Sequence, residues 1–325
     1  MAHQLTIRPN GFAEIALARQ PAWHGLGTVL PNLMTSEEAL TAAGLDWQVE
    51  KRPLYRKVGD QFVALPQEQI LVRVDNEEVL GVVTDHYRVV QNVEGFRWLD
   101  ALVEQDQLRY EAAFSLQGGR KVVLLARTPG YGEVLPSDVI LPYILFILGH
   151  DGRTGIRCGP VAVRVVCANT LRIAEQTYEL MRVSHIGDVS KKLEYMRQIM
   201  KVYLELFTDY ITEANRLANR KLSEQEVQLI LDRLFPVDKS LPLETQLALH
   251  DKRYQIMQLF TQAETNNLPG MERTAWSLFC AIVEYIDHGL RGAAESRVMN
   301  SLFTVGARLK KRAWETIKQL VFSAA

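Results

Sequence analysis

The stretch RYEAAFSLQGGRKVVLLA, residues 109–126, decides the fold class of this chain. Two strand-like runs, 109–116 and 121–126, flank Gln117-Gly118-Gly119, and glycine supplies the positive φ that a tight hairpin turn requires. The pattern therefore predicts an antiparallel hairpin.

Short strand-like runs surround this hairpin on both sides. Downstream, residues 139–148 (VILPYILFIL) and 161–167 are apolar and are joined by a polar loop. Upstream, strand-like runs at 47–50, 54–58, 62–65, 70–74 and 79–83 are divided by Pro53, Gly59-Asp60, Pro66 and Asp75-Asn76. Proline and glycine interrupt strands, because proline lacks an amide proton and glycine favours turns. We therefore expect hairpins and a long meander, with short helices over 36–43, capped by Ser36, and over 92–104.

The pattern becomes helical after residue 169. Asn169 or Thr170 is expected to cap a first helix, and apolar residues recur at helical spacing from Leu193 to Ile211. Further helices are expected over 223–234, 243–261, 272–288 and 296–321. The sequence predicts an α+β fold, with a mixed or antiparallel sheet followed by a C-terminal all-helical region. We place an α+β domain at 1–186 and a helical domain at 187–325.

The composition of the 325 residues is that of a globular protein, with 47% hydrophobic and 23% charged residues. No apolar run reaches the ~18 residues that span a bilayer, so we expect no membrane partner. The segment MAHQLTIRPN lacks a signal-peptide core, which favours a cytoplasmic location. Three cysteines, Cys158, Cys167 and Cys280, cannot form a disulfide framework, and an odd number fits a reducing compartment.

Charge is distributed unevenly, although the formal net charge is only −1. Residues 151–220 hold 11 Lys or Arg and 8 Asp or Glu, and residues 291–325 hold 7 and 2. Residues 222–290 hold 5 and 10, so two basic zones flank an acidic helical one. This arrangement is compatible with an anionic partner.

Motifs for common catalytic chemistry are missing from the sequence. It contains no GxxxxGK[ST] phosphate loop, no GxGxxG after a strand, no CxxC or HExxH and no nucleophile elbow. We therefore expect no cofactor, no metal site and no enzymatic activity. Cys158 and Cys167 are interpreted as small apolar core residues.

Three segments stand out from this background. In Trp23-His24-Gly25-Leu26-Gly27, His24 is either a base or ligand, or a hydrogen-bonded residue of a fold corner. In the segment from His86 to Asn92, Tyr87 either stacks on a base or packs on the sheet. In the segment 163–172, Arg164 and Arg172 either form a phosphate seat at a helix start or pair with acids such as Glu175.

The C-terminal run Arg308-Leu309-Lys310-Lys311-Arg312 lies on an amphipathic helix that also carries Trp314. Basic residues beside an aromatic one are typical of a surface that follows phosphates. The alternative interpretation is an ordinary solvated helix face.

These segments together resemble the family known as domain of unknown function 932, the phage/plasmid-like proteins. The resemblance rests on Ala22–Gly27, Ala43–Trp47, Tyr87–Asn92, Gly118–Arg120, Arg164–Leu171, Thr274–Trp276, Glu284–His288 and Gly306–Ala313. The chain departs from the family pattern at Ser184-His185-Ile186, where an Arg-His-Thr-like triplet is expected. The resemblance implies a mobile-element setting and no particular activity.

A weaker resemblance concerns topology. Hairpins and further strands, followed by a long helix with basic residues, are similar to the core of Rad-type and phage single-strand annealing proteins, an argument by analogy of fold. Those proteins form rings or filaments and hold single strands in a basic groove. The resemblance therefore implies a homo-oligomer and a role in recombination.

We expect a single-stranded DNA-binding protein, with strand annealing as a further expected activity. Binding would combine phosphate contacts with base stacking, and no bond would form or break. The expected contacts are Arg120, Lys121, Arg153, Arg157, Arg164, Arg172, Lys191, Lys192, Arg308, Lys310, Lys311, Arg312, Tyr87 and Trp314.

Two other functions fit the sequence. One is an interaction protein of host defence or counter-defence, with the acidic helices 222–290 as its contact face. The other is an enzyme that uses His24 or His86, which the missing catalytic motifs disfavour.

Overall fold

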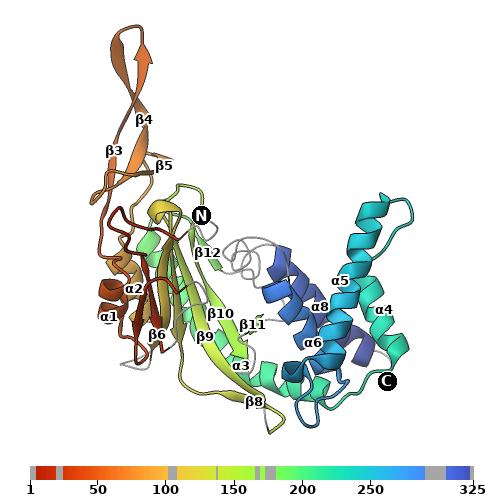
Figure 1. Ribbon diagram of the computed structural model, residues 1–325. Coiled ribbons are helices and arrows are strands. Elements are labelled where there is room, and N and C mark those ends of the chain that lie inside the picture. The colour runs from red at the N-terminus through yellow and green to blue at the C-terminus, as the bar shows by residue number, and fades with distance from the viewer. Residues whose placement is uncertain are drawn as a thin grey trace.

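The protein is described here by a computed structural model that covers residues 5–19, 25–101, 108–136, 138–164, 169–172, 181–289 and 305–322. The side chains of residues 169–172 and 200–206 lie outside this description. Figure 1 shows a β-rich half, from which a long ribbon projects, and a helical half beside it. The α+β class and the C-terminal helical region are therefore confirmed.

A large mixed sheet forms the centre of the β-rich half, with strand order β11-β10-β9-β7-β6-β1-β2. Strand β12 also pairs with β10, strand β8 pairs with β9, and only β1 and β2 are parallel among the described pairs. The strands are β1 (Ile15–Ala18), β2 (Thr28–Leu30), β6 (Arg109–Leu116), β7 (Lys121–Arg127), β8 (Gly132–Val134), β9 (Asp138–Gly149), β10 (Ile156–Arg164), β11 (Asn169–Arg172) and β12 (Met181–Val183).

The predicted hairpin is present as β6 and β7, joined by a short 3₁₀ turn, η1 (Gln117–Gly119). Gly118 and Gly119 have φ values of +73° and +104°, which favour glycine. A Cβ atom on Gly119 would lie 3.1 Å from the Trp47 ring, so the turn also needs a residue without a side chain.

A smaller sheet contains β3 (Val49–Val58), β4 (Gln61–Arg73) and β5 (Val79–Thr84). The expectation of separate short strands here is wrong, because β3 runs through Pro53 and β4 runs through Pro66. The β3–β4 register shifts between Pro53 and Leu54, and Pro66 lies in the matching irregular part of β4. Proline is tolerated there because a bulge needs no regular ladder hydrogen bond.

Apart from the helix expected after Asn169 or Thr170, the described helices overlap the predicted ranges. They are α1 (Ser36–Ala42), α2 (Asn92–Asp100), α3 (Val189–Ala218), α4 (Glu224–Leu234), α5 (Leu243–Gln262), α6 (Ala275–Glu284), the π-helical turn η3 (Tyr285–Gly289) and α8 (Val305–Phe322). Thr35, rather than Ser36, caps α1: its hydroxyl accepts from the Glu38 amide, and the Glu38 carboxylate accepts from the Thr35 amide.

The expected helix after Asn169 or Thr170 is not formed. Residues Asn169–Arg172 instead make strand β11, which pairs with β10, and Met181–Val183 make β12. The first long helix begins only at Val189. Strands this short lack a recognisable period, and their pairing with a distant strand overrides local capping signals.

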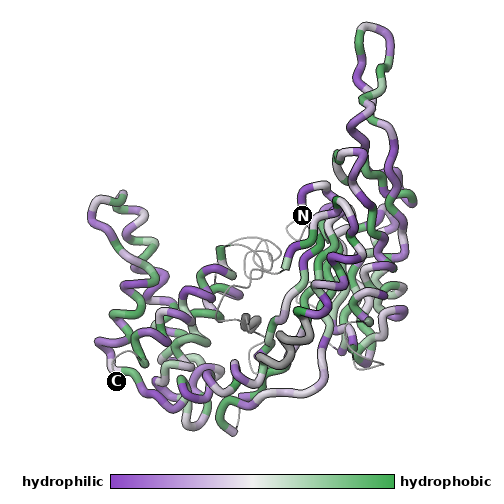
Figure 2. Tube along the Cα trace, turned by 180° about the vertical axis from the view of Figure 1, so that it is seen from behind, coloured by the Kyte–Doolittle hydropathy of each residue, from purple (hydrophilic) through white to green (hydrophobic). Residues whose placement is uncertain are grey.

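Three hydrophobic clusters hold the elements together. One fills the space between the large sheet and α1, α2 and the start of α3, and another lies on the opposite face of the sheet. The third unites the helices with Val134, Ile140 and Ala162 of the sheet. Figure 2 shows the apolar residues concentrated along the strands of the large sheet. The helical region thus packs directly on one end of the sheet, and the division at residue 186 stays a prediction.

Within the described part of the chain, no helix combines the length and the apolar character that crossing a bilayer requires. Cys158 is buried in the core, as predicted, and Cys280 is buried as well. Cys167 lies outside the described residues.

Candidate nucleic-acid interface

Three arginines gather at the β12 edge of the large sheet. Arg182 of β12 lies directly opposite Arg157 of β10 in the antiparallel register. The Arg182 guanidinium also donates a hydrogen bond to the backbone oxygen of Arg153, at 3.0 Å. Two predicted contacts, Arg153 and Arg157, are therefore brought together by a third arginine that the sequence analysis did not select.

The start of α3 adds two lysines beside this strand. The Lys192 ammonium donates to the Ser184 hydroxyl at 3.0 Å and to the Ile186 carbonyl at 2.7 Å. The Lys191 side chain is 87% exposed, and its ammonium lies 3.6 Å from the Asp188 carboxylate. We refer to Arg153, Arg157, Arg182, Lys191 and Lys192 as the basic edge.

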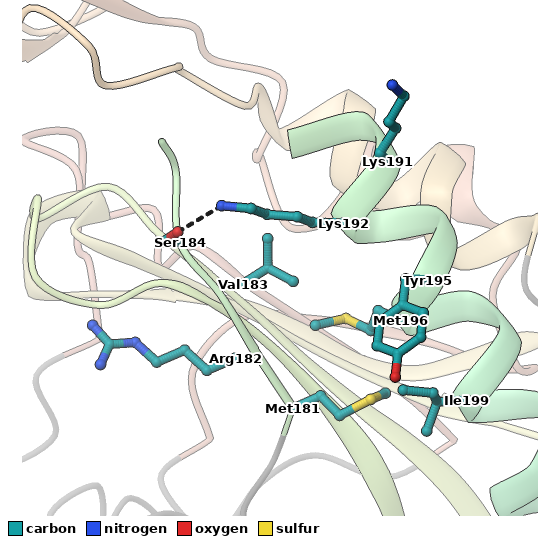
Figure 3. Close-up of a pocket in the computed structure, with 9 residues that line it drawn as sticks. All are labelled: Met181, Arg182, Val183, Ser184, Lys191, Lys192, Tyr195, Met196 and Ile199. Atoms are coloured by element: carbon teal, nitrogen blue, oxygen red, sulfur yellow. Dashed lines mark hydrogen bonds between the residues drawn. The ribbon is translucent and has the colours of Figure 1, made fainter. Parts of the chain in front are cut away.

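An open pocket of about 540 Å³ lies between β12 and α3. Figure 3 shows that Met181, Met196 and Ile199 form an apolar wall, with Lys191 and Lys192 at one end of the pocket. Tyr195 stands at the same wall and is 67% exposed. The pocket therefore combines cations with an accessible aromatic ring.

Arg182 points to the other side of β12, as Figure 3 shows. This follows from the alternation of side chains along a strand, since Val183 is buried in the core on the α3 side. The basic edge therefore presents positive charge on both faces of β12.

The N-terminus of α3 is already capped by a carboxylate. The Asp188 side chain accepts a hydrogen bond from the Lys191 amide at 3.0 Å, and this bond lowers the pKa of Asp188. An anion at this site would therefore be bound by the lysine side chains rather than by the free amides of a helix end.

Tyr87 packs inside the protein, which corrects its expected role as a base-stacking residue. It is 7% exposed, and its ring stacks on His185 with centroids 4.6 Å apart and planes 13° from parallel. Its hydroxyl donates to the Gly149 carbonyl at 3.2 Å. Burial raises the pKa of Tyr87. The alternative of packing on the sheet is therefore the right one.

His150 is a buried polar residue that the sequence analysis placed only in a loop. Its Nε2 lies 2.8 Å from Oδ1 of Asn92, and the Asn92 amide group donates to the Leu45 carbonyl. Oδ1 is therefore the acceptor, so Nε2 carries the proton. Burial lowers the pKa of His150 to about 3, so the imidazole is neutral and joins the sheet to α2.

Arg164 is a core residue, which overturns its expected phosphate contact. Its Nε lies 2.7 and 2.8 Å from the two carboxylate oxygens of Asp138, and both side chains are fully buried. The guanidinium also donates to Oδ1 of Asn266 at 3.0 Å. The alternative prediction, that Arg164 pairs with an acidic residue, is correct, but the partner is Asp138 and not Glu175.

Lys310 and Trp314 are also buried, so neither forms part of a nucleic-acid surface. The Lys310 ammonium lies 2.5 Å from the Asp287 carboxylate, and the two side chains are 2% and 6% exposed. Trp314 is 4% exposed and stacks on Tyr210, with ring centroids 5.0 Å apart. Both residues lie on the face of α8 that packs into the helical core.

The other basic residues of α8 are separate from the basic edge. Arg308 is exposed, Lys311 lies 3.7 Å from Glu315, and Arg312 donates to the Arg233 carbonyl of α4 at 2.5 Å. Their contribution to binding stays a prediction.

Arg120 and Lys121 follow the turn between β6 and β7. Arg120 donates to the backbone carbonyls of Leu80 and Val79, at 3.0 and 3.1 Å, so it fastens the smaller sheet to the larger one. Lys121 begins β7 and is half-buried.

Several predicted residues cannot be placed. The Arg172 side chain, Trp23 and His24 lie outside what the structure describes. His86 is 79% exposed in its side chain, and its Nε2 lies 3.5 Å from the Asp85 carboxylate. Among the residues described, no cluster of three His, Cys, Asp or Glu side chains is arranged to hold a metal ion.

Two residues of the site, Arg182 and Tyr195, were missed by the sequence analysis. Arg182 lies in a three-residue strand without alternation, and Tyr195 occupies an ordinary position in a long helix. The one sequence feature that pointed to this region was weak: residues 151–220 contain more basic than acidic residues.

The fold and the basic edge define a mixed α+β protein with a candidate anion-binding surface. Comparison with protein families gives a match over residues 79–316, about three quarters of the chain, to the family described as Domain of unknown function (DUF932). The chain belongs to this family. No curated protein and no solved structure gives a significant match.

Proposed function

We propose that this protein binds single-stranded nucleic acid along the basic edge. The observation that carries the proposal is a set of five basic residues from three segments around β12. Lys191 and Lys192 lie beside the exposed Tyr195, and Arg182 points to the other face of the strand. The segments are the loop before β10, the β10–β12 pair and the start of α3. The loop contributes Arg153, the strand pair contributes Arg157 and Arg182, and the helix contributes Lys191 and Lys192.

The binding mechanism follows from these groups. Lysine and arginine neutralise phosphates and release condensed counterions, which makes affinity depend on salt. An exposed aromatic ring such as Tyr195 stacks on an unpaired base, because every base has a π-face. Bases within a duplex are already stacked on one another, so this combination favours single strands.

Strand annealing and assembly into an oligomer belong to the same proposal. They are supported only by the topological resemblance to single-strand annealing proteins. The basic edge provides the feature that such proteins need, namely cations that hold a phosphate backbone while bases stay accessible.

Fluorescence anisotropy with labelled oligonucleotides tests this proposal. Titrations with single-stranded and double-stranded DNA at about 50 and 200 mM salt would show affinity and its salt dependence. We expect tighter binding to the single strand and weaker binding at the higher salt. Lack of binding to both substrates at the lower salt would contradict the proposal.

A second candidate function is protein interaction through the acidic helices, and one observation favours it. Leu243, Leu247 and Tyr254 of α5 are 70%, 59% and 63% exposed. Exposed apolar side chains on an acidic surface fit a protein partner better than an anionic one. Affinity purification with the wild type and with L243A/L247A tests this function. We expect the wild type to retain one cellular protein in preference to DNA, and the variant to lose that protein.

A further inference from the structure

The outer part of the β3–β4 pair stands alone as a two-stranded ribbon. Within the part of the chain that the structure describes, residues 54–65 pair only with one another, from Leu54 opposite Leu65 to Val58 opposite Gln61. Strand β5 reaches only the stretch Glu68–Val72 of β4. Figure 1 shows this outer ribbon as an arm that projects away from both halves of the molecule.

Large apolar side chains of the outer ribbon are exposed to solvent. Phe62 is 72% exposed, Tyr55 54%, Val58 52% and Val63 40%. An isolated two-stranded ribbon is marginally stable in water, and exposed apolar groups of this kind mark binding surfaces. The arm therefore has the properties of a segment that contacts a partner.

The register places a particular set of side chains on one face. Lys57 lies opposite Phe62, and Tyr55 lies opposite Ala64, so Tyr55 and Phe62 are diagonal neighbours on that face, and Lys57 is adjacent to both. The aromatic face of the ribbon is thus Tyr55, Lys57 and Phe62. Two flat rings beside a cation suit stacked bases and their phosphates.

The charge of the outer ribbon favours an anionic partner. Arg56 and Lys57 form no ion pair with any residue that the structure describes, and Asp60 is the single acid between residues 54 and 65. Two cations with one acid give the outer ribbon a net positive charge, which opposes close association with the same ribbon of a second copy.

The arm is structurally continuous with the basic edge. A Cβ on Gly81 of β5 would lie 2.5 Å from the Asp151 carbonyl oxygen, so the loop that carries Arg153 packs tightly on the base of the arm. In the same way, a Cβ added to Gly152 would lie 2.6 Å from the Val82 carbonyl oxygen. The base of the arm and the loop of the basic edge are therefore adjacent in the fold.

We propose that the outer ribbon is a second contact for the same single strand, with Tyr55 and Phe62 stacking on bases while Lys57, on the same face, neutralises a phosphate. The inference rests on the proposed function and extends its site. The ribbon reaches about 17 Å beyond the three-stranded part of the sheet, given about 3.3 Å per residue. The bound strand then covers more nucleotides than the basic edge alone.

The variant Y55A/F62A tests this contact. We expect its affinity for a single strand of about 30 nucleotides to fall at least about tenfold, because each stacked base contributes substantially to binding. The matched control is Y254A, which removes a tyrosine of similar exposure, 63%, from acidic helix α5 and should bind as the wild type does. Thermal unfolding followed by circular dichroism should be unchanged in both variants.

The outcomes separate this inference from the function on which it rests. If the wild type does not bind, the proposed function fails and the inference with it. If the wild type binds and K191E/K192E weakens binding while Y55A/F62A does not, only the role of the arm is refuted. Loss of self-association in Y55A/F62A, measured by sedimentation with unchanged DNA affinity, would assign the arm to a second copy and also overturn the inference.

A spectroscopic measurement tests stacking directly. The variant F62W places an indole on the aromatic face, and stacking on a base quenches its fluorescence. We expect quenching on addition of single-stranded DNA that is larger than in the wild type, together with retained affinity. Unchanged emission at saturation would overturn the stacking contact.

Discussion

Arg164 and Asp138 form a fully buried ion pair in which the arginine Nε lies 2.7 and 2.8 Å from the two carboxylate oxygens. Asp138 also accepts a hydrogen bond from the Trp276 indole at 2.8 Å. The pair therefore ties strands β9 and β10 to helix α6, at the contact between the sheet and the helices.

Removal of one partner should destabilise the protein strongly. In R164A the Asp138 carboxylate would remain buried without its counter-charge, and such changes cost about 3–5 kcal/mol. Urea unfolding measures this free energy directly. R216A is the matched control, because the Arg216 side chain is 57% exposed and Glu213 keeps a second partner, Lys318, so the lost pair contributes under about 1 kcal/mol. Equal stability of R164A and R216A would refute the assignment of Arg164 to the core.

The buried His150 should make the free energy of unfolding depend on pH. Its folded pKa, about 3, lies below the ordinary value of 6.5, so between these pH values the unfolded chain binds a proton that the folded protein does not. The contribution of the neutral His150 to the free energy of unfolding is therefore fully present above pH 6.5. It is lost as the pH falls toward 3, by up to about 1.4 kcal/mol per pH unit.

Comparison with H150Q isolates this contribution from that of the carboxylates. The stability advantage of the wild type over H150Q should shrink between pH 7 and pH 4 in urea unfolding. Parallel stability curves over that range would show that His150 is not held neutral by burial.

The hairpin over 109–126 and the apolar run 139–148 were predictable because their patterns are local. Strand β12 was not, since three residues without alternation form a strand only by pairing with Ile156–Cys158 of β10. The basic edge depends on that pairing. Local sequence patterns therefore could not predict that these basic residues lie close together.

The four buried residues among the predicted contacts, Tyr87, Arg164, Lys310 and Trp314, show a different limit. Lys310 lies on the same helix face as Ala307, Trp314, Ile317 and Val321, all of them buried. Helical spacing alone would have indicated this burial. By contrast, the partner of Arg164 lies 26 residues earlier in the chain, and that of Tyr87 lies 98 residues later. Only the fold brings these partners together.

The contact between the arm and the loop at Asp151 should be sensitive to a single methyl group. In G81A the new Cβ would lie 2.5 Å from the Asp151 carbonyl oxygen, a backbone atom that must move. We expect a loss of about 1–3 kcal/mol in urea unfolding, as for other overpacked sites. Because the displaced loop carries Arg153, DNA affinity of the folded variant should fall as well. Wild-type stability in G81A would contradict this packing.

Charge reversal should separate the basic edge from the basic residues of α8. R308E/K311E changes residues that are exposed or half-buried and lie away from β12, so it should retain the fold and most of the DNA affinity. K191E/K192E should retain the fold and lose affinity. Anisotropy titrations of the two variants provide the comparison. The reverse order of affinities would place the site on α8 instead.

The salt dependence of binding in K191E/K192E tests the central claim most directly. For single strands, the slope of log K against log salt changes by about 0.7 for each phosphate contact, so two lost contacts should reduce its magnitude by about 1.4. The measurement compares this variant with wild type and with K239E, which reverses an exposed lysine between α4 and α5. We predict the reduced slope in K191E/K192E alone. Identical slopes in all three proteins would contradict binding at the basic edge.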